Sequence, residues 1–147
     1  MSESSFETVI FNQQGNINTE RTLQLAYQRA QKTGINTVLV ATTSGKTGVM
    51  AVDLMKNTQV IAVSHSSGIK TQNTQELDEE NRNKIIAQNG KVLTCQHAFG
   101  GVNRAIRKKF GTYQIDEVIA HTLRLFSQGI KVIIEMSLMA ADSGLIR

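Results

Sequence analysis

The sequence predicts an α/β domain with three layers, α/β/α, in which helices cover both faces of a mainly parallel β-sheet. Short runs of β-branched residues alternate along the chain with longer amphipathic stretches. That alternation is typical of parallel sheets whose strands are joined by right-handed helical crossovers. The 147 residues contain no proline and no Gly/Ser-rich linker, so we expect a single domain over residues 1–147.

The N-terminal part predicts a strand, a helix and a second strand. Residues 8–11 (TVIF) combine β-branched and aromatic side chains, a composition typical of strands. A helix then begins at Asn18, whose side chain can accept hydrogen bonds from free helix amides, and it ends at Gly34. Residues 37–41 (TVLVA) form a continuous apolar run, as expected for a strand that is buried on both faces.

The middle of the chain repeats this order. A short helix over residues 47–56 leads to a strand over residues 59–63 (QVIAV). Asn73, with a glutamate three residues later, resembles a capping box and predicts the start of the next helix. The acidic residues around this position favour a helix N-terminus over a metal site. Gly90 ends that helix, and residues 91–94 (KVLT) predict another strand.

The C-terminal third predicts two helices and a last strand. Residues 99–110 indicate a basic helix and residues 113–128 a longer one, each followed by a glycine that ends it. Residues 131–136 (KVIIEM) predict the last strand, and residues 137–147 follow as a segment of small residues.

Composition limits the classes of partner. A net charge of +4 suits small anionic ligands, whereas 5% aromatic residues and no tryptophan argue against a nucleic-acid platform. Residues 1–6 lack the basic and apolar regions of a signal peptide, and no apolar run approaches the ~20 residues of a membrane span. Cys95 is the only cysteine, so no intrachain disulfide can form, and we expect a cytoplasmic protein without a membrane anchor.

The loop over residues 42–47 is the first candidate site, because open α/β sheets bind ligands outside the carboxyl ends of their strands. It leaves a buried strand and enters a helix, whose free amides and dipole attract anions. These features predict a phosphate site formed by Thr42, Thr43, Ser44, Gly45, Lys46 and Thr47. A P-loop is excluded because Val40 stands where that motif requires a glycine. An ordinary strand-to-helix turn remains the alternative.

The other loops at this edge add candidates with more than one interpretation. His65 can contact a ligand phosphate or hydroxyl, act as an acid or base, or be a plain loop residue. His97 can flank a planar ring together with Phe99, or serve as the base for a Cys95 thiol, and Phe99 can equally belong to the core. Asp142 can accept from sugar or ribityl hydroxyls or form a turn. The histidines lack the spacing of paired metal ligands, so we expect no metal.

The helix expected over residues 99–110 also carries a basic face. Arg104, Arg107 and Lys108 recur at helical spacing, and Lys109 adjoins them. Such a face can hold a second anion or a polyanionic partner, or it can be an ordinary solvated surface.

Four stretches stand in a distinctive order: residues 11–35 (FNQQGNINTERTLQLAYQRAQKTGI), residues 37–63 with the loop ATTSGKTG, residues 95–111 with two glycines before the basic helix, and residues 135–146 (EMSLMAADSGLI). The second stretch resembles the C-terminal α/β domain of pyruvate kinase. The four together resemble the free-standing pyruvate kinase alpha/beta domain-like family over essentially the whole chain. The resemblance implies the fold of the pyruvate kinase C-terminal domain.

The resemblance also implies a binding role. Pyruvate kinase catalysis belongs to a separate barrel domain, for which this sequence has no room, and the free-standing relatives resemble binders of flavin mononucleotide (FMN). The resemblance thus implies FMN, with a sugar phosphate as the alternative ligand. It implies that the 43–47 loop holds the phosphate and that other residues line the ribityl chain and ring: His65, Ser67, Gly68, His97, Phe99, Asp142 and Ser143. A flavin-using or other small-molecule enzyme is a second interpretation.

Relatives of this kind usually continue with a Gly-rich segment and another strand, whereas this sequence ends at Arg147. We therefore expect either a missing edge strand or cover from another chain, because an unpaired edge strand invites association. A homo-oligomer is the expected form.

Overall fold

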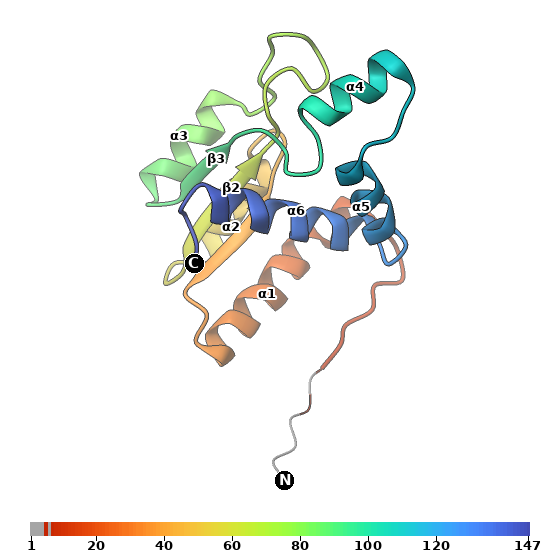
Figure 1. Cartoon of the computed structure of the whole chain (residues 1–147). Helices are drawn as coiled ribbons and strands as arrows, with labels where there is room; N and C mark the ends of the chain where they lie inside the picture. The colour runs from red at the N-terminus through yellow and green to blue at the C-terminus, as the bar shows by residue number, and fades with distance from the viewer. Residues whose placement is uncertain (1–4, 6) are drawn as a thin grey trace.

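The computed structural model describes residue 5 and residues 7–147 and contains one parallel sheet (Figure 1). Its strands are β1 (Thr37–Ala41), β2 (Gln59–Ser64) and β3 (Lys91–Thr94), in the order β1-β2-β3. Leu39 pairs with Ile61, and Val63 pairs with Leu93, so the carboxyl ends of the strands meet at one edge. The bounds of β1 and β3 match the predicted ones.

Three helices cover one face of this sheet: α1 (Thr19–Thr33), α2 (Lys46–Leu54) and α3 (Glu79–Ala87). A short 3-10 turn, η1 (Asn16–Asn18), precedes α1. Alternate strand residues point to this face, where they form one core cluster with apolar side chains of the helices. The buried members of that cluster are Leu23, Val40, Ala51, Val52, Met55, Val60, Ala62 and Ile85.

A single long helix, α6 (Gln128–Asp142), covers the opposite face. Ile61, Val63 and Leu93 of the strands pack there against Met136, Met139 and Ala140 of the helix. Between β3 and α6 the chain forms α4 (Val102–Phe110) and α5 (Ile115–Arg124), which lie to one side of the sheet (Figure 1). The three-layer α/β/α prediction is therefore confirmed.

Two of the predicted strands are wrong. Residues 131–136 lie inside α6, because Val132, Met136 and Met139 recur at helical spacing and bury one stripe against the sheet. The helix also takes in residues 137–142, which begin the segment of small residues that was expected to follow the strand. Residues 8–11 form no strand and pair with no neighbour; Ile10 is 85% exposed, so the burial that favours strand pairing is missing.

Two predicted helix starts also differ from the structure. Asn18 precedes α1 without capping it, since its side chain donates to the carbonyl of Gln13 instead. Asn73 lies in a left-handed turn, and α3 begins at Glu79 with Asp78 as its cap, accepting from the amide of Asn81 at 3.1 Å. The helix begins after Asp78 and not after Asn73, because acidic residues follow Asp78 and are favoured at the positive end of a helix.

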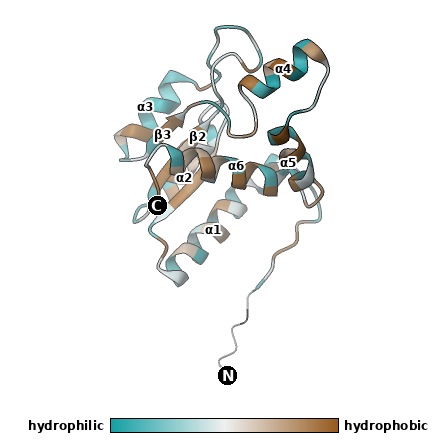
Figure 2. Cartoon of the chain, in the orientation of Figure 1, coloured by the Kyte–Doolittle hydropathy of each residue, from teal (hydrophilic) through white to brown (hydrophobic). Residues whose placement is uncertain are grey.

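Hydropathy follows this layering. The strands are largely hydrophobic and α3 is mostly hydrophilic, whereas α5 and α6 both contain brown, hydrophobic segments (Figure 2). No helix within residues 7–147 is long and apolar enough to cross a membrane. The sequence of residues 1–6 was interpreted as lacking a signal peptide. Apart from residue 5, this segment lies outside the described residues.

Candidate functional site

A cavity of about 570 Å³ lies at the carboxyl ends of β1 and β2, with α6 as its opposite wall. Its volume is typical of small-molecule sites, which span roughly 300–1,000 Å³. Hydroxyl, imidazole and charged side chains from four separate segments converge on it: Thr42, Thr43, Ser44, Thr47, Ser64, His65, His97, Arg104, Lys131 and Glu135. The cavity therefore stands where the parallel sheet predicts a ligand.

The turn between β1 and α2 presents amides to this cavity. On the far side of the turn, the carbonyl of Ser44 accepts from the amide of Asp78 and from the side chain of Asn81. The amide of Gly45 donates to the Thr42 hydroxyl at 3.1 Å. No described residue accepts from the amides of Thr43, Ser44, Lys46 or Thr47. These donors stand at the positive end of α2, where an anion is favoured.

Gly45 and Lys46 have roles that differ from the expected ones. Gly45 has φ +94, and a Cβ there would lie 2.6 Å from Cβ of Asn81 and 2.8 Å from Leu77. The glycine is thus required by packing against the start of α3. The Lys46 side chain is exposed and does not line the cavity.

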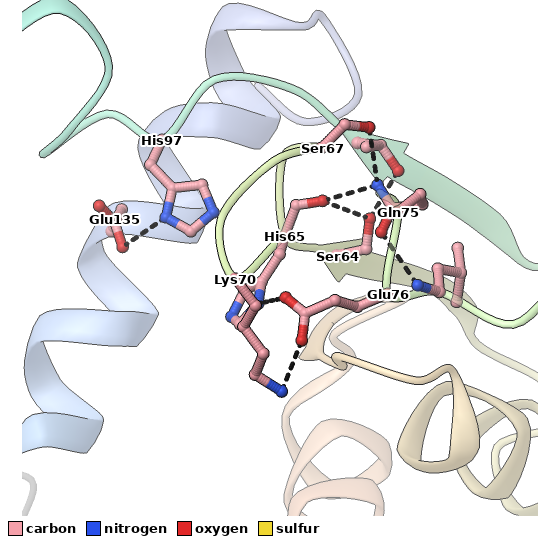
Figure 3. Close-up of polar contacts among 10 residues, drawn as sticks. Ser64, His65, Ser67, Lys70, Gln75, Glu76, His97 and Glu135 are labelled. Carbon is pink, nitrogen blue, oxygen red and sulfur yellow. Dashed lines mark hydrogen bonds and ion pairs between the residues drawn. The ribbon is translucent and has the colours of Figure 1, made fainter. Parts of the chain in front are cut away.

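His65 is oriented by a carboxylate. Its Nδ1 lies 2.8 Å from Glu76, and Glu76 also forms an ion pair with Lys70 at 2.7 Å (Figure 3). Lys70 first, and His65 second, hold the pKa of the Glu76 carboxyl below its usual value. The ionised carboxylate accepts a hydrogen bond, so Nδ1 of His65 carries a proton, and in the neutral imidazole Nε2 is then an acceptor.

His97 stands beside a buried network on α6. Glu135 accepts from the amide of Phe99 at 3.0 Å and pairs with Lys131 one turn away, and its carboxylate lies 3.7 Å from Nδ1 of His97 (Figure 3). The rings of His97 and His65 are 5.5 Å apart between centroids. The loop after β3 and the helix α6 thereby bring a second imidazole into the same cavity.

Burial lowers the pKa of His97, and although Glu135 opposes this shift, Arg104, His65 and Lys131 add to it. His97 is therefore neutral at physiological pH. Its buried Nε2 has no hydrogen-bond partner among the described residues. An unsatisfied buried polar atom costs about 1–3 kcal/mol, so a ligand group that hydrogen-bonds with Nε2 recovers free energy that the protein alone forgoes.

Arg104 supplies a cation to the cavity. It is half-buried, and no described carboxylate forms an ion pair with it. A methyl group at Gly100 would lie 2.7 Å from its guanidinium, so that glycine makes room for the side chain. The predicted basic face is divided, because Arg107 turns to Glu117 and lies over the Tyr113 ring.

Several candidate residues lie outside the cavity. Ser67 and Gly68 belong to the loop beyond His65, where Ser67 accepts from Gln75. Phe99 is buried beneath Lys131, which matches its core interpretation. The remaining ones do not line the cavity either: Cys95 packs against the α6 core cluster, and Asp142 and Ser143 stand at the carboxyl end of α6.

Four residues in or beside the site were not predicted from the sequence: Lys131 and Glu135, which line the cavity, and Lys70 and Glu76, which hold His65 from behind. Lys131 and Glu135 are four residues apart, a spacing that joins side chains on a helix and separates them in a strand. Assigning their segment to a strand hid that signal. Within the described residues, no group of three or more His, Cys, Asp or Glu side chains can hold a metal ion.

The parallel sheet with a cavity at the carboxyl ends of its strands places the chain in the class of open α/β domains, which receive ligands at that edge. Residues 20–146 match the family described as pyruvate kinase, alpha/beta domain, and the chain belongs to this family. The match spans nearly the whole sequence and agrees with the resemblance seen there.

Proposed function

We propose that this domain binds a phosphate-bearing small molecule, FMN in the first place, without pyruvate kinase activity. The observation that carries the proposal is the set of amides at the start of α2, beside the cavity, that donate to no residue described in the structure. A phosphate dianion can accept from several of them at once, and the helix dipole adds to the attraction. The uncompensated charge of Arg104 favours an anion in the same space.

The cavity also has an apolar part suited to a ring system. Ile69, Val132 and Met136 line it, opposite the hydroxyl-rich turn. Ligand sites combine such apolar walls with a few placed polar groups. This division supports FMN over a sugar phosphate, which would leave the apolar wall without a partner.

Titration of the purified protein with FMN and with riboflavin, followed by flavin fluorescence, tests the proposal. The two ligands differ only in the phosphate, so we expect FMN to bind about tenfold or more tightly than riboflavin. Equal affinities would show that the amides of the turn hold no phosphate. If neither flavin binds but ribose 5-phosphate does, the phosphate site stands and the flavin assignment falls.

A charge variant makes this test specific. Thr47 lies in the first turn of α2 and lines the cavity. Thr47→Asp places a carboxylate where it suits the helix dipole, so folding is preserved while phosphate is repelled. The matched control is Thr19→Asp in the first turn of α1. We expect FMN affinity to fall at least about tenfold in the first variant and to stay unchanged in the second.

We also propose that the domain self-associates and works in the cytoplasm. Large apolar side chains of the α5 region are largely exposed, among them Ile115, Leu125 and Phe126. Exposed apolar surface of this kind is typical of interaction sites, and β1 is an edge strand of the described sheet. Native mass spectrometry measures the subunit number, and a monomer at micromolar concentration would contradict self-association.

A further inference from the structure

Two imidazole rings from different loops line the same cavity. His65 follows β2 and His97 follows β3, and their ring centroids are 5.5 Å apart (Figure 3). Both residues line the cavity. Each ring has a carboxylate on its Nδ1 side: Glu76 at 2.8 Å for His65 and Glu135 at 3.7 Å for His97.

These carboxylates determine the hydrogen-bonding character of the pair. Glu76 is ionised through Lys70 and accepts the Nδ1 proton of His65. The Glu135 carboxylate, which is held by Lys131 and the Phe99 amide, faces Nδ1 of His97 at 3.7 Å, and its negative charge favours the tautomer with the proton on Nδ1. A neutral imidazole with its proton on Nδ1 exposes a lone pair on Nε2. No hydrogen bond joins Nε2 of either ring to a described residue.

The groups around the pair decide which donor fits. Arg104 contributes an uncompensated positive charge, and the start of α2 contributes the positive end of a helix. Both disfavour a cationic donor such as an ammonium group. Neutral hydroxyl groups satisfy the two acceptors without repulsion, and neighbouring hydroxyls on one short carbon chain can reach both rings.

Resting on the proposed function, we infer that His65 and His97 together select a polyol phosphate, a ligand whose carbon chain carries neighbouring hydroxyl groups next to the phosphate ester. The turn after β1 supplies the affinity for phosphate, and the two imidazole acceptors supply the specificity for hydroxyls. The inference concerns discrimination within the site and holds for any such ester, with or without a ring.

Calorimetric titration with ribitol 5-phosphate and with pentyl phosphate tests the inference, because these probes differ in the hydroxyl groups alone. At slightly alkaline pH we expect ribitol 5-phosphate to bind on the order of tenfold or more tightly. His65→Phe and His97→Phe each keep a ring but remove an acceptor, and should bring the ratio of affinities toward one while pentyl phosphate binding is retained. His121→Phe, on the exposed side of α5, is the matched control and should keep the wild-type ratio.

Each outcome decides something definite. Equal binding of the two esters by the wild-type protein overturns the selection of hydroxyls while leaving the phosphate site in place. A preference that survives in both phenylalanine variants assigns the selection to other residues. If neither ester nor inorganic phosphate binds, the proposed function fails together with the inference. The His97 side chain is largely buried, so its phenylalanine variant could fail to fold. The His65→Phe variant keeps the test valid in that case, because His65 is partly exposed and its replacement disturbs no core packing.

Discussion

Lys131 and Glu135 face each other one turn apart on α6, and both side chains are almost completely buried. Removing one member of such a pair leaves the other charge buried without compensation. We therefore expect Lys131→Met to destabilise the domain by about 3–5 kcal/mol, measured by urea unfolding.

The double variant Lys131→Met with Glu135→Gln provides the control. The amide oxygen of a glutamine can still accept from the Phe99 amide, and no buried charge remains. We expect most of the lost stability to return. If the double variant were as unstable as Lys131→Met alone, the packing of Lys131 rather than its charge would account for the loss.

The burial of the His97 imidazole leads us to expect that the free energy of unfolding depends on pH. Burial lowers the pKa of His97. The charged or titratable groups that face the ring are Glu135, which raises the pKa, and Arg104, His65 and Lys131, which lower it. The unfolded chain, with an ordinary pKa of 6.5, therefore binds the proton more readily than the folded one. The contribution of His97 is fully present above that value and is lost as pH falls toward the lowered pKa of the folded state.

His97→Gln removes this titration. We expect thermal melts of the variant to depend less on pH than those of the wild type between neutral and mildly acidic pH. His121→Gln serves as the comparison, because His121 is exposed on α5. Parallel pH profiles for the His97 variant and the wild type would show that burial does not disfavour the imidazolium.

Alanine substitutions at Gly45 and Gly111 distinguish a steric collision from backbone strain. Both glycines have positive φ, +94 and +70, but a Cβ at Gly45 would collide with Asn81 whereas one at Gly111 meets nothing within 4 Å. Gly111→Ala should therefore cost only the left-handed strain of about 1–2 kcal/mol. Gly45→Ala should cost clearly more in the same chemical denaturation experiment. Equal losses would show that α3 moves aside freely.

The N-cap residue Asp78 stabilises α3, the helix that packs against the 42–47 turn. Its side chain caps α3 by accepting from the amide of Asn81. Asp78→Ala should lower the free energy of unfolding by about 1 kcal/mol, the usual value of an N-cap. Asp142→Ala, near the carboxyl end of α6, removes an exposed carboxylate without any cap and should cost nothing. Equal effects of the two changes would contradict the role of the cap.

Local patterns in the sequence predicted most of the fold. The apolar runs of β1, β2 and β3 exceed what a solvated segment tolerates, and their alternation with helices leads to a parallel sheet. The same reasoning located the 42–47 turn at the carboxyl edge and indicated His65 and His97 beside it, which the cavity brings together. The prediction of a strand over residues 131–136 was wrong because a short apolar run fits a strand and a buried helix equally well.

What the sequence determined by itself is thus the layered architecture, the order of the strands along the chain and the loops that meet at one edge, since these depend on local periodicity. Tertiary structure alone decided that α6 lies across the sheet, that Glu76 and Glu135 back the two histidines, and that Arg104 turns toward the cavity. Those contacts join residues from separate elements, and their free energy depends on burial and on distance in space. Neither quantity is expressed in the spacing of residues along a chain.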